Sequence, residues 1–299
     1  MIPPRPVRPG FLWLRRLVAP TAVLSLVANL AAADTSVLVV WEDNVTNTTA
    51  AGGRLSAWML AVNASDEMRR PLTRDDALYL GGDVASNLCL DYHELDDLAA
   101  GPHLALLHKF GLGAYAPALR LDTAVAGLAA RDSARSGWSS RVALNWSRRF
   151  TEALRLDLNG DLTRTNAHAD VFTTSTRALA ADLAYDLNDQ WRFKARVGWR
   201  HGDVVSYSRA YWTAWGWAPD GYNGDSLGYS SAPSRLVDTF KQPYLAYRVR
   251  AHTWSYAATL SPALGPNTAL VLSYEYCATE NSSARYVNQL LSAGVAHRF

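Results

Sequence analysis

In three consecutive segments of the chain, charged side chains of one sign recur at every second or fourth position. The alternate positions are acidic within residues 154–162 and 179–187, and basic within residues 191–200. These residues are Asp157, Asp161, Asp182, Asp186, Arg192, Lys194, Arg196 and Arg200. If the segments are neighbouring strands, a cationic stripe lies beside an anionic one. Such stripes either create a transverse field that orients ions and small polar solutes, or close on themselves through cross-strand salt bridges.

Six further charged residues extend this pattern in other segments. Arg120, Arg155, Arg248 and Arg250 add positive charge, and Asp122 and Glu275 add negative charge. We expect all six to line the same interior, together with the stripes.

The segment 202–243 has a different composition, rich in aromatic residues and glycine. Its aromatic residues are Tyr207, Tyr211, Trp212, Trp215, Trp217, Tyr222 and Tyr229. Trp and Tyr at such density could stack on sugar rings or on a partner, or fold inward and constrict a passage. The alternative is that the ends of the segment simply prolong the flanking strands. We expect a mixture of these.

A third feature, Asp91 two residues before His93, is an acid–His pair that could activate water for hydrolysis. The same spacing arises by chance on many strands, and no second acidic pair accompanies it. The histidines are scattered without metal-ligand spacing. We therefore expect neither an enzyme nor a cofactor or metal, with a hydrolase at the rim as the weaker alternative.

Strands are the elements that must position these residues. Leu154, Leu156 and Leu158 alternate with charged residues, and this period of two recurs along most of the chain. Alternation fits both a soluble sandwich and a membrane barrel, which place the leucines on opposite sides. The segments are about nine to fifteen residues long, which favours tilted strands that span a bilayer. Aromatic residues near strand ends, such as Trp191 and Trp199, favour an interfacial girdle.

The first 33 residues have the pattern of a cleaved signal peptide. Four arginines precede an apolar stretch at 17–30, and the small residues 31–33 precede Asp34. Removal of this segment changes the net charge from +2 to −2, so no nucleic-acid partner is implied. No later apolar run reaches eighteen residues. A spanning helix is therefore excluded after residue 33, which leaves a closed barrel as the way to cross a membrane.

The C-terminus ends on Phe299, with Gly294 five positions earlier. Leu291, Ala293 and Val295 share the parity of Phe299, so they share one face of a strand. This segment resembles the C-terminal signal of bacterial outer-membrane β-barrel proteins, although His297 departs from the usual pattern. The resemblance implies a bacterial outer-membrane location and recognition of Gly294 and Phe299 by the barrel-assembly machinery.

Twelve strands account for the alternating segments, and 10 or 14 stay open. We place them at 35–45, 52–63, 76–92, 103–113, 117–130, 138–150, 153–165, 174–187, 190–201, 244–260, 267–279 and 285–299. Short links alternate with longer polar ones, as periplasmic turns and external loops do. Only the link at 66–75 is long for the periplasmic side. An even count leaves both termini periplasmic.

These observations predict an all-β fold, a transmembrane antiparallel up-and-down β-barrel that occupies residues 34–299 as a single domain. The leading functional hypothesis is a small channel for hydrophilic solutes or ions. The alternative is a barrel that anchors or exports a surface polysaccharide or a partner protein through its aromatic external loop. Expected partners are outer-membrane lipids, the assembly machinery, and a small polar solute or glycan. Cys89 and Cys277 lie on strands too far apart for a disulfide.

Overall fold

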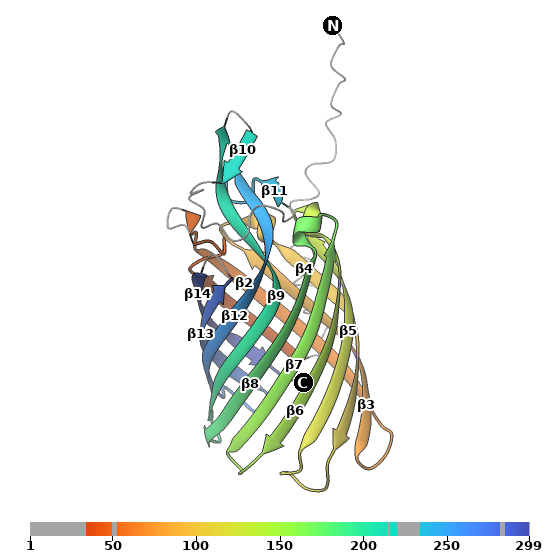
Figure 1. The fold of residues 1–299 in the computed structure, drawn as a ribbon. Coiled ribbons are helices and arrows are strands. Elements are labelled where there is room, and N and C mark those ends of the chain that lie inside the picture. Colours follow the sequence, from red (N-terminus) through yellow and green to blue (C-terminus); the bar gives the residue numbers. More distant parts are fainter. Residues whose placement is uncertain (1–33, 50–52, 214–215, 220–233, 282–284, 299) are drawn as a thin grey trace, which may run out of the picture.

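Twelve long antiparallel strands form a closed barrel in the computed structural model, which describes residues 34–49, 53–213, 216–219, 234–281 and 285–298. Sequence neighbours pair along the sheet, β14 pairs with β1, and β9 pairs with β12 (Figure 1). The twelve are β1 (Asp34–Glu42), β2 (Ala57–Pro71), β3 (Asp76–Cys89), β4 (Asp97–Lys109), β5 (Ala118–Ala130), β6 (Gly137–Arg149), β7 (Leu154–Ala167), β8 (Thr174–Asn188), β9 (Trp191–Thr213), β12 (Tyr244–Pro262), β13 (Thr268–Glu280) and β14 (Arg285–His297). The predicted fold class and strand number are confirmed.

Two further short strands lie outside the barrel wall. β10 (Gly216–Pro219) pairs with the end of β9, and β11 (Ser234–Val237) pairs with the start of β12. β9 and β12 pair from the barrel up to Arg209 and Tyr244. The long connection therefore begins and ends as an extended hairpin, as the simpler interpretation of segment 202–243 predicted.

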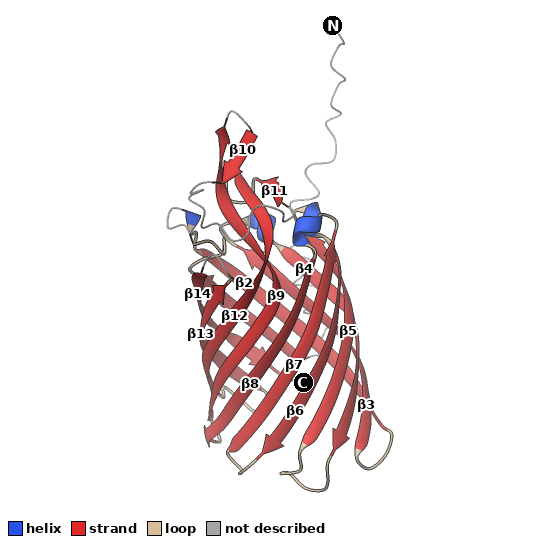
Figure 2. Ribbon diagram, in the orientation of Figure 1, coloured by secondary structure: helices blue, strands red, loops and turns tan. Residues whose placement is uncertain are grey.

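The two ends of the barrel differ in the length of their connections. The end with short turns includes residues 72–75, because β2 continues to Pro71. The prediction of a long link at 66–75 is therefore wrong, because the first half of this range belongs to β2. This part of the strand lies near the polar end of the barrel and therefore lacks the apolar alternation. The opposite end carries the longer loops and the short helices η3 (His93–Leu95), η4 (Ser133–Arg135) and η5 (Asp170–Phe172) (Figure 2).

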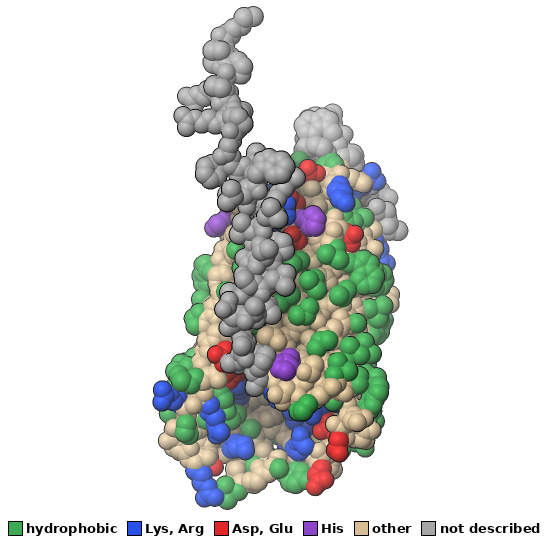
Figure 3. Space-filling model, turned by 180° about the vertical axis from the view of Figure 1, so that it is seen from behind, with side chains coloured by type: hydrophobic (Ala, Val, Ile, Leu, Met, Phe, Trp, Pro, Cys, Tyr) green, Lys and Arg blue, Asp and Glu red, His purple; other side chains and the backbone are tan. Residues whose placement is uncertain are grey.

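The outer surface of the barrel is apolar around its middle. Leu162 and Leu179 on β7 and β8 expose 62% and 60% of their surface, whereas a soluble sandwich would bury such residues in its core. Hydrophobic side chains spread across the visible rear face, and charged side chains gather toward its two ends (Figure 3). An apolar exterior with a polar lumen is the arrangement of membrane barrels. No helix in the described part of the chain is long and apolar enough to span a bilayer.

Candidate functional site

A polar cavity of about 1110 Å³ occupies the interior of the barrel. The predicted residues that line it are Arg155, Asp157, Asp161, Asp182, Lys194, Arg196, Arg200 and Glu275. A second cavity, of about 1180 Å³, lies toward the end with short turns and is lined by Asp186 and Arg192 among others. Arg141 lines both cavities, so they meet at this side chain.

The wall formed by β7, β8 and β9 brings opposite charges together. Cross-strand pairing places Asp157 opposite Asp182, and Asp182 opposite Arg196. The Asp182 carboxylate is 3.0 Å from Lys194 Nζ and accepts a hydrogen bond from Asn159 Nδ2 at 2.9 Å. The two stripes are thus joined through Asp182, whose side chain is only 4% exposed.

The remaining residues of these stripes are only partly neutralised. Arg155 pairs with Asp157 at 2.9 Å, and Arg192 pairs with Asp186 at 2.5 Å. Among the described residues, Arg200 makes no ion pair. The wall therefore keeps exposed positive charge inside the lumen.

A second charged cluster lies on the opposite wall, on β2 to β5. Arg120 forms a two-pronged contact with Glu67, at 2.8 and 3.2 Å, and also bonds Asp122 at 2.8 Å. His103 Nδ1 lies 2.9 Å from Asp83. Of these five residues, the sequence analysis identified only Arg120 and Asp122.

Glu67 and Arg141 show why lumen residues were missed. Glu67 lies beyond residue 63, where we expected the second strand to end, and its neighbour Asp66 is also acidic, so the alternation there gives no signal. Arg141 alternates with the exposed residues Val142 and Leu144. That alternation was available in the sequence and would have found it.

Arg248 and Arg250 are not in the lumen, contrary to our expectation. They share the parity of Trp254 and Tyr256 on β12, whose rings are 43% and 50% exposed on the outer surface. Arg248 donates hydrogen bonds to the carbonyl oxygens of Asp170 and Thr173, in the loop between β7 and β8. The expectation failed because the alternation is inverted in this part of β12: Val249 and Ala251 are buried and face inward, and the arginines beside them face outward.

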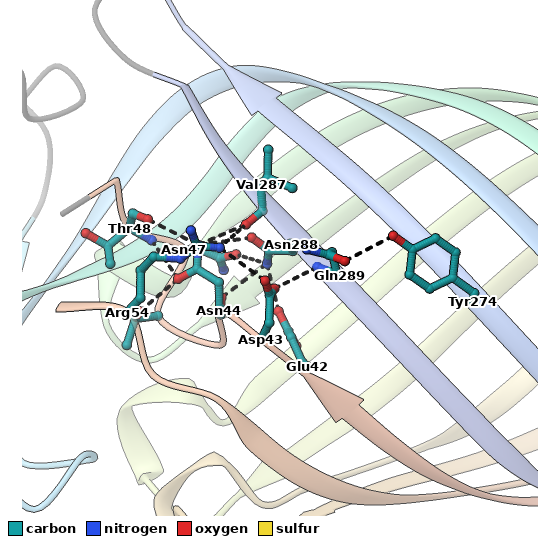
Figure 4. Close-up of polar contacts among 11 residues, drawn as sticks. Glu42, Asp43, Asn44, Asn47, Thr48, Arg54, Tyr274, Val287, Asn288 and Gln289 are labelled. Atoms are coloured by element: carbon teal, nitrogen blue, oxygen red, sulfur yellow. Dashed lines mark hydrogen bonds and ion pairs between the residues drawn. The ribbon is translucent and has the colours of Figure 1, made fainter. Parts of the chain in front are cut away.

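The described parts of the first long loop, residues 43–49 and 53–56, fold over the end of the barrel through a buried polar network (Figure 4). Asn44 is fully buried, and its side chain bonds Thr48, Asn288 and the Val287 carbonyl oxygen. Asn288 donates to Glu42 and Asn47, both at 2.7 Å. Asn47 has a positive φ of 52°, a backbone conformation that asparagine tolerates.

The same loop reaches β9, which is four strands away from β1 round the barrel. Tyr207 N donates to Thr46 O at 2.8 Å, and Asn47 Nδ2 donates to Val205 O at 3.2 Å. Since the order is β1, β14, β13, β12 and β9, these contacts require the loop to lie across the mouth.

Apolar side chains from the strand ends and from the other long loops form a buried cluster with Val45 of this segment. The buried cluster contains Val45, Ala57, Cys89, Ala134, Val171, Phe172, Tyr207, Val237, Phe240, Tyr244 and Ala246. We call residues 43–49 and 53–56 together with this cluster the cap. Phe240 is central to it, because its ring contacts those of Tyr92, Tyr207 and Tyr244 at centroid distances of 4.8–5.1 Å. Burial in the cap raises the pKa of Tyr207.

The other predicted aromatic residues are only partly covered by the structure. Tyr211 and Trp212 lie in β9, and Trp217 lies in β10 opposite Trp212. Trp215, Tyr222 and Tyr229 lie outside the described residues, as does Phe299. The role of these residues in binding a glycan or a partner stays a prediction.

Asp91 and His93, the basis of the weaker hydrolase alternative, are not paired with each other. The Asp91 carboxylate accepts a hydrogen bond from Trp58 N at 2.9 Å, whereas His93 Nδ1 lies 3.7 Å from Asp96. Each side chain thus has another neighbour, and the geometry gives no support to a hydrolytic dyad. Cys89 and Cys277 are both free thiols.

Comparison with known proteins shows the fold but no family. Neither a scan of family models nor a search of curated proteins found a match. Among solved structures, an outer-membrane channel from Pseudomonas putida F1 aligns with a TM-score of 0.52 at 12% identity, over 89% of this chain and 96% of that one. The NanC porin aligns at 0.49 with 8% identity, over 89% and 100%. The chain shares its barrel fold with the Pseudomonas putida channel.

Asp182→Asn is expected to make the lumen more anion-selective. The carboxylate is the shared counter-charge of Lys194 and Arg196, so its neutralisation leaves both cations to attract anions. Reversal potentials in a salt gradient measure this change. Asp66→Asn is the control, because exposed Asp66 shares the outward parity of Met68 on β2. Equal selectivity in both variants would show that Asp182 does not face the ion path.

Proposed function

We propose that this protein is an outer-membrane channel for small hydrophilic solutes or ions, with a cap of loops that controls the outer mouth. The observation that carries the proposal is the pair of charged cavities that meet at Arg141 inside a barrel with an apolar exterior. Water and ions are stabilised along such a lining, whereas a structural barrel of this size would fill its interior with side chains.

The charge distribution supports selection among solutes. Exposed arginines lie on β9, and carboxylates lie on β7 and β8 beside them. A solute in the cavity is therefore subject to a field across the lumen, which orients dipolar molecules and favours one sign of ion. The identity of the solute does not follow from this field.

The orientation in the membrane is part of the proposal. The end with short turns would face the periplasm with both termini, and the cap and the β9–β12 hairpin would face outward, as connection lengths do in outer-membrane barrels. Residues 1–33 would be the export signal. Gly294 and Phe299 would belong to the segment recognised by the assembly machinery.

Charge reversal on β9 tests the proposal. The double variant Arg196→Glu and Arg200→Glu is expected to shift selectivity toward cations, because both residues line the cavity. Reversal potentials of the purified protein in a planar bilayer measure the shift. Arg148→Glu is the matched control, since Arg148 points outward beside Phe150 at the turn end. A double variant with wild-type selectivity would contradict a conducting path along this wall.

The cap favours one second candidate. A packed cap beneath a long hairpin is also what a closed barrel would need to present the hairpin to a surface polysaccharide or a partner protein. That function needs no conduction. A folded protein that never conducts, even with the cap disrupted, would support it over the channel.

A further inference from the structure

A belt of arginines follows the apolar band on the outer surface of β7, β8 and β12. On β7 the outward series passes from Leu162 to Arg164. On β8 it passes from Leu179 to Arg177. Arg250 on β12 belongs to the same belt. These residues lie at the end that carries the long loops, where the bilayer core would give way to headgroups.

Strand pairing brings these side chains round one cleft. Arg177 is opposite both Leu162 and His201, and Arg164 is opposite Ser175. The cleft has a volume of about 440 Å³ and opens outward, away from the lumen. Its lining comprises Ser140, Val142, Leu162, Thr163, Arg164, Ser175, Thr176, Arg177, His201, Gly202 and Arg250.

The three guanidinium groups of this cleft lack acidic partners. Among the described residues, none of Arg164, Arg177 and Arg250 makes an ion pair. Asp203 is opposite Arg250 in the pairing of β9 with β12, and its carboxylate accepts a hydrogen bond from Ser175 N at 2.9 Å. Arg177 lies over the ring of Trp199, at 5.9 Å from its centroid, which holds it on this face. Three arginines without an ion pair round one cleft are a favourable environment for phosphate, which guanidinium groups bind in a two-pronged manner.

An apolar groove of about 730 Å³ lies on the same strands, one outward position nearer the middle of the barrel. The groove exists because Gly160 and Ala181 are small, while Leu158, Leu179 and Trp199 form its sides. Gly160 and Leu162 are successive outward residues of β7, so the cleft and the groove adjoin.

We propose that the cleft and the groove together bind a phosphorylated glycolipid of the outer leaflet. The phosphates would contact Arg164, Arg177 and Arg250, and an acyl chain would lie in the groove beside Gly160 and Ala181. A soluble phosphate would use the cleft alone and would leave the adjoining groove without a role. The proposal rests on the outward orientation given above but not on an open lumen.

The test is a titration of the full-length purified protein in detergent with diphosphorylated lipid A, followed by native mass spectrometry. The triple variant Arg164→Gln, Arg177→Gln and Arg250→Gln is expected to lose at least tenfold in affinity, because the charged contacts to phosphate are gone. The corresponding triple lysine variant keeps the charge and is expected to recover part of the affinity. Arg148→Gln, outward but at the opposite end, is the control and keeps wild-type affinity.

Two further probes separate a lipid site from an anion site. Dephosphorylated lipid A is expected to bind at least tenfold more weakly than the diphosphorylated form, and inorganic phosphate alone is expected to compete poorly. Gly160→Leu, which fills the groove, is expected to weaken lipid binding without changing the cleft. Wild-type lipid affinity in a heat-modifiable triple glutamine variant would overturn the proposal, as would full competition by inorganic phosphate. The conductance of that variant is expected to be unchanged, which keeps this test separate from the channel.

Discussion

Gly294→Val is expected to prevent most of the protein from reaching the folded, heat-modifiable form. An ideal Cβ at Gly294 would lie 2.0 Å from the Val37 carbonyl oxygen and 2.7 Å from Leu38 Cα, both backbone atoms of β1. Valine is otherwise favoured in strands, so a loss would come from this clash. The pairing of β14 with β1 closes the barrel, and a shift there disturbs the pairing of both edges.

Semi-native electrophoresis after refolding measures the folded fraction. Gly127→Val is the matched control, because the nearest atom to a Cβ at that position is 3.9 Å away. Overpacking in a well-packed site costs about 1–3 kcal/mol, and the seam has little room to relax. A Gly294→Val protein that folds as well as the control would mean that β1 and β14 approach less closely than described.

Asn44→Ala is expected to loosen the cap and raise the single-channel conductance. The side chain is fully buried and bonds five groups: Thr46 Oγ1, Thr48 N, Thr48 O, Val287 O and Asn288 Oδ1. Each buried partner left without a bond costs about 1–3 kcal/mol. This cost falls on the loop that crosses the mouth, and the barrel wall keeps its own hydrogen bonds.

The conductance and the rate of limited proteolysis within residues 43–56 measure the effect. Both are expected to rise at least twofold, while the temperature of heat modification changes little. Gln289→Ala is the control, because the exposed Gln289 side chain shares the outward parity of Leu291 and accepts a hydrogen bond from Tyr274 Oη at 3.1 Å. If Asn44→Ala matches this control in both measurements, the loop does not restrict the mouth.

The barrel was predictable because its signal is local and repeated. A period of two over a dozen residues separates the apolar face of each strand from its polar face. Chain-wide features such as strand length then indicate that the apolar face meets lipid and the polar face meets the lumen. The parity also placed Asp182 and Arg196 on one wall before any contact was known, and the structure pairs them across β8 and β9.

The cap was not predictable, because its contacts join distant loops. Asn44 and Asn288 are 244 residues apart and bond through side-chain amides, which leave no periodic trace in a single sequence. The prediction that Arg250 lines the lumen was wrong for a related reason. Above the apolar band the apolar residues of β12, such as Val249 and Ala251, face inward. The outward orientation of Arg250 follows from its shared parity with Trp254. Because Arg250 was placed on the wrong face, the outward cleft that it forms with Arg164 and Arg177 was not predicted either.

The most direct test of the channel is the single-channel conductance of refolded wild-type protein in a planar bilayer. We expect steady steps that tolerate voltage, with selectivity that follows the charges on β8 and β9. Protein that is heat-modifiable and yet gives no steps, both as wild type and as Asn44→Ala, would contradict the account. In that case the lumen is sealed by its own salt bridges, and the external hairpin becomes the functional surface.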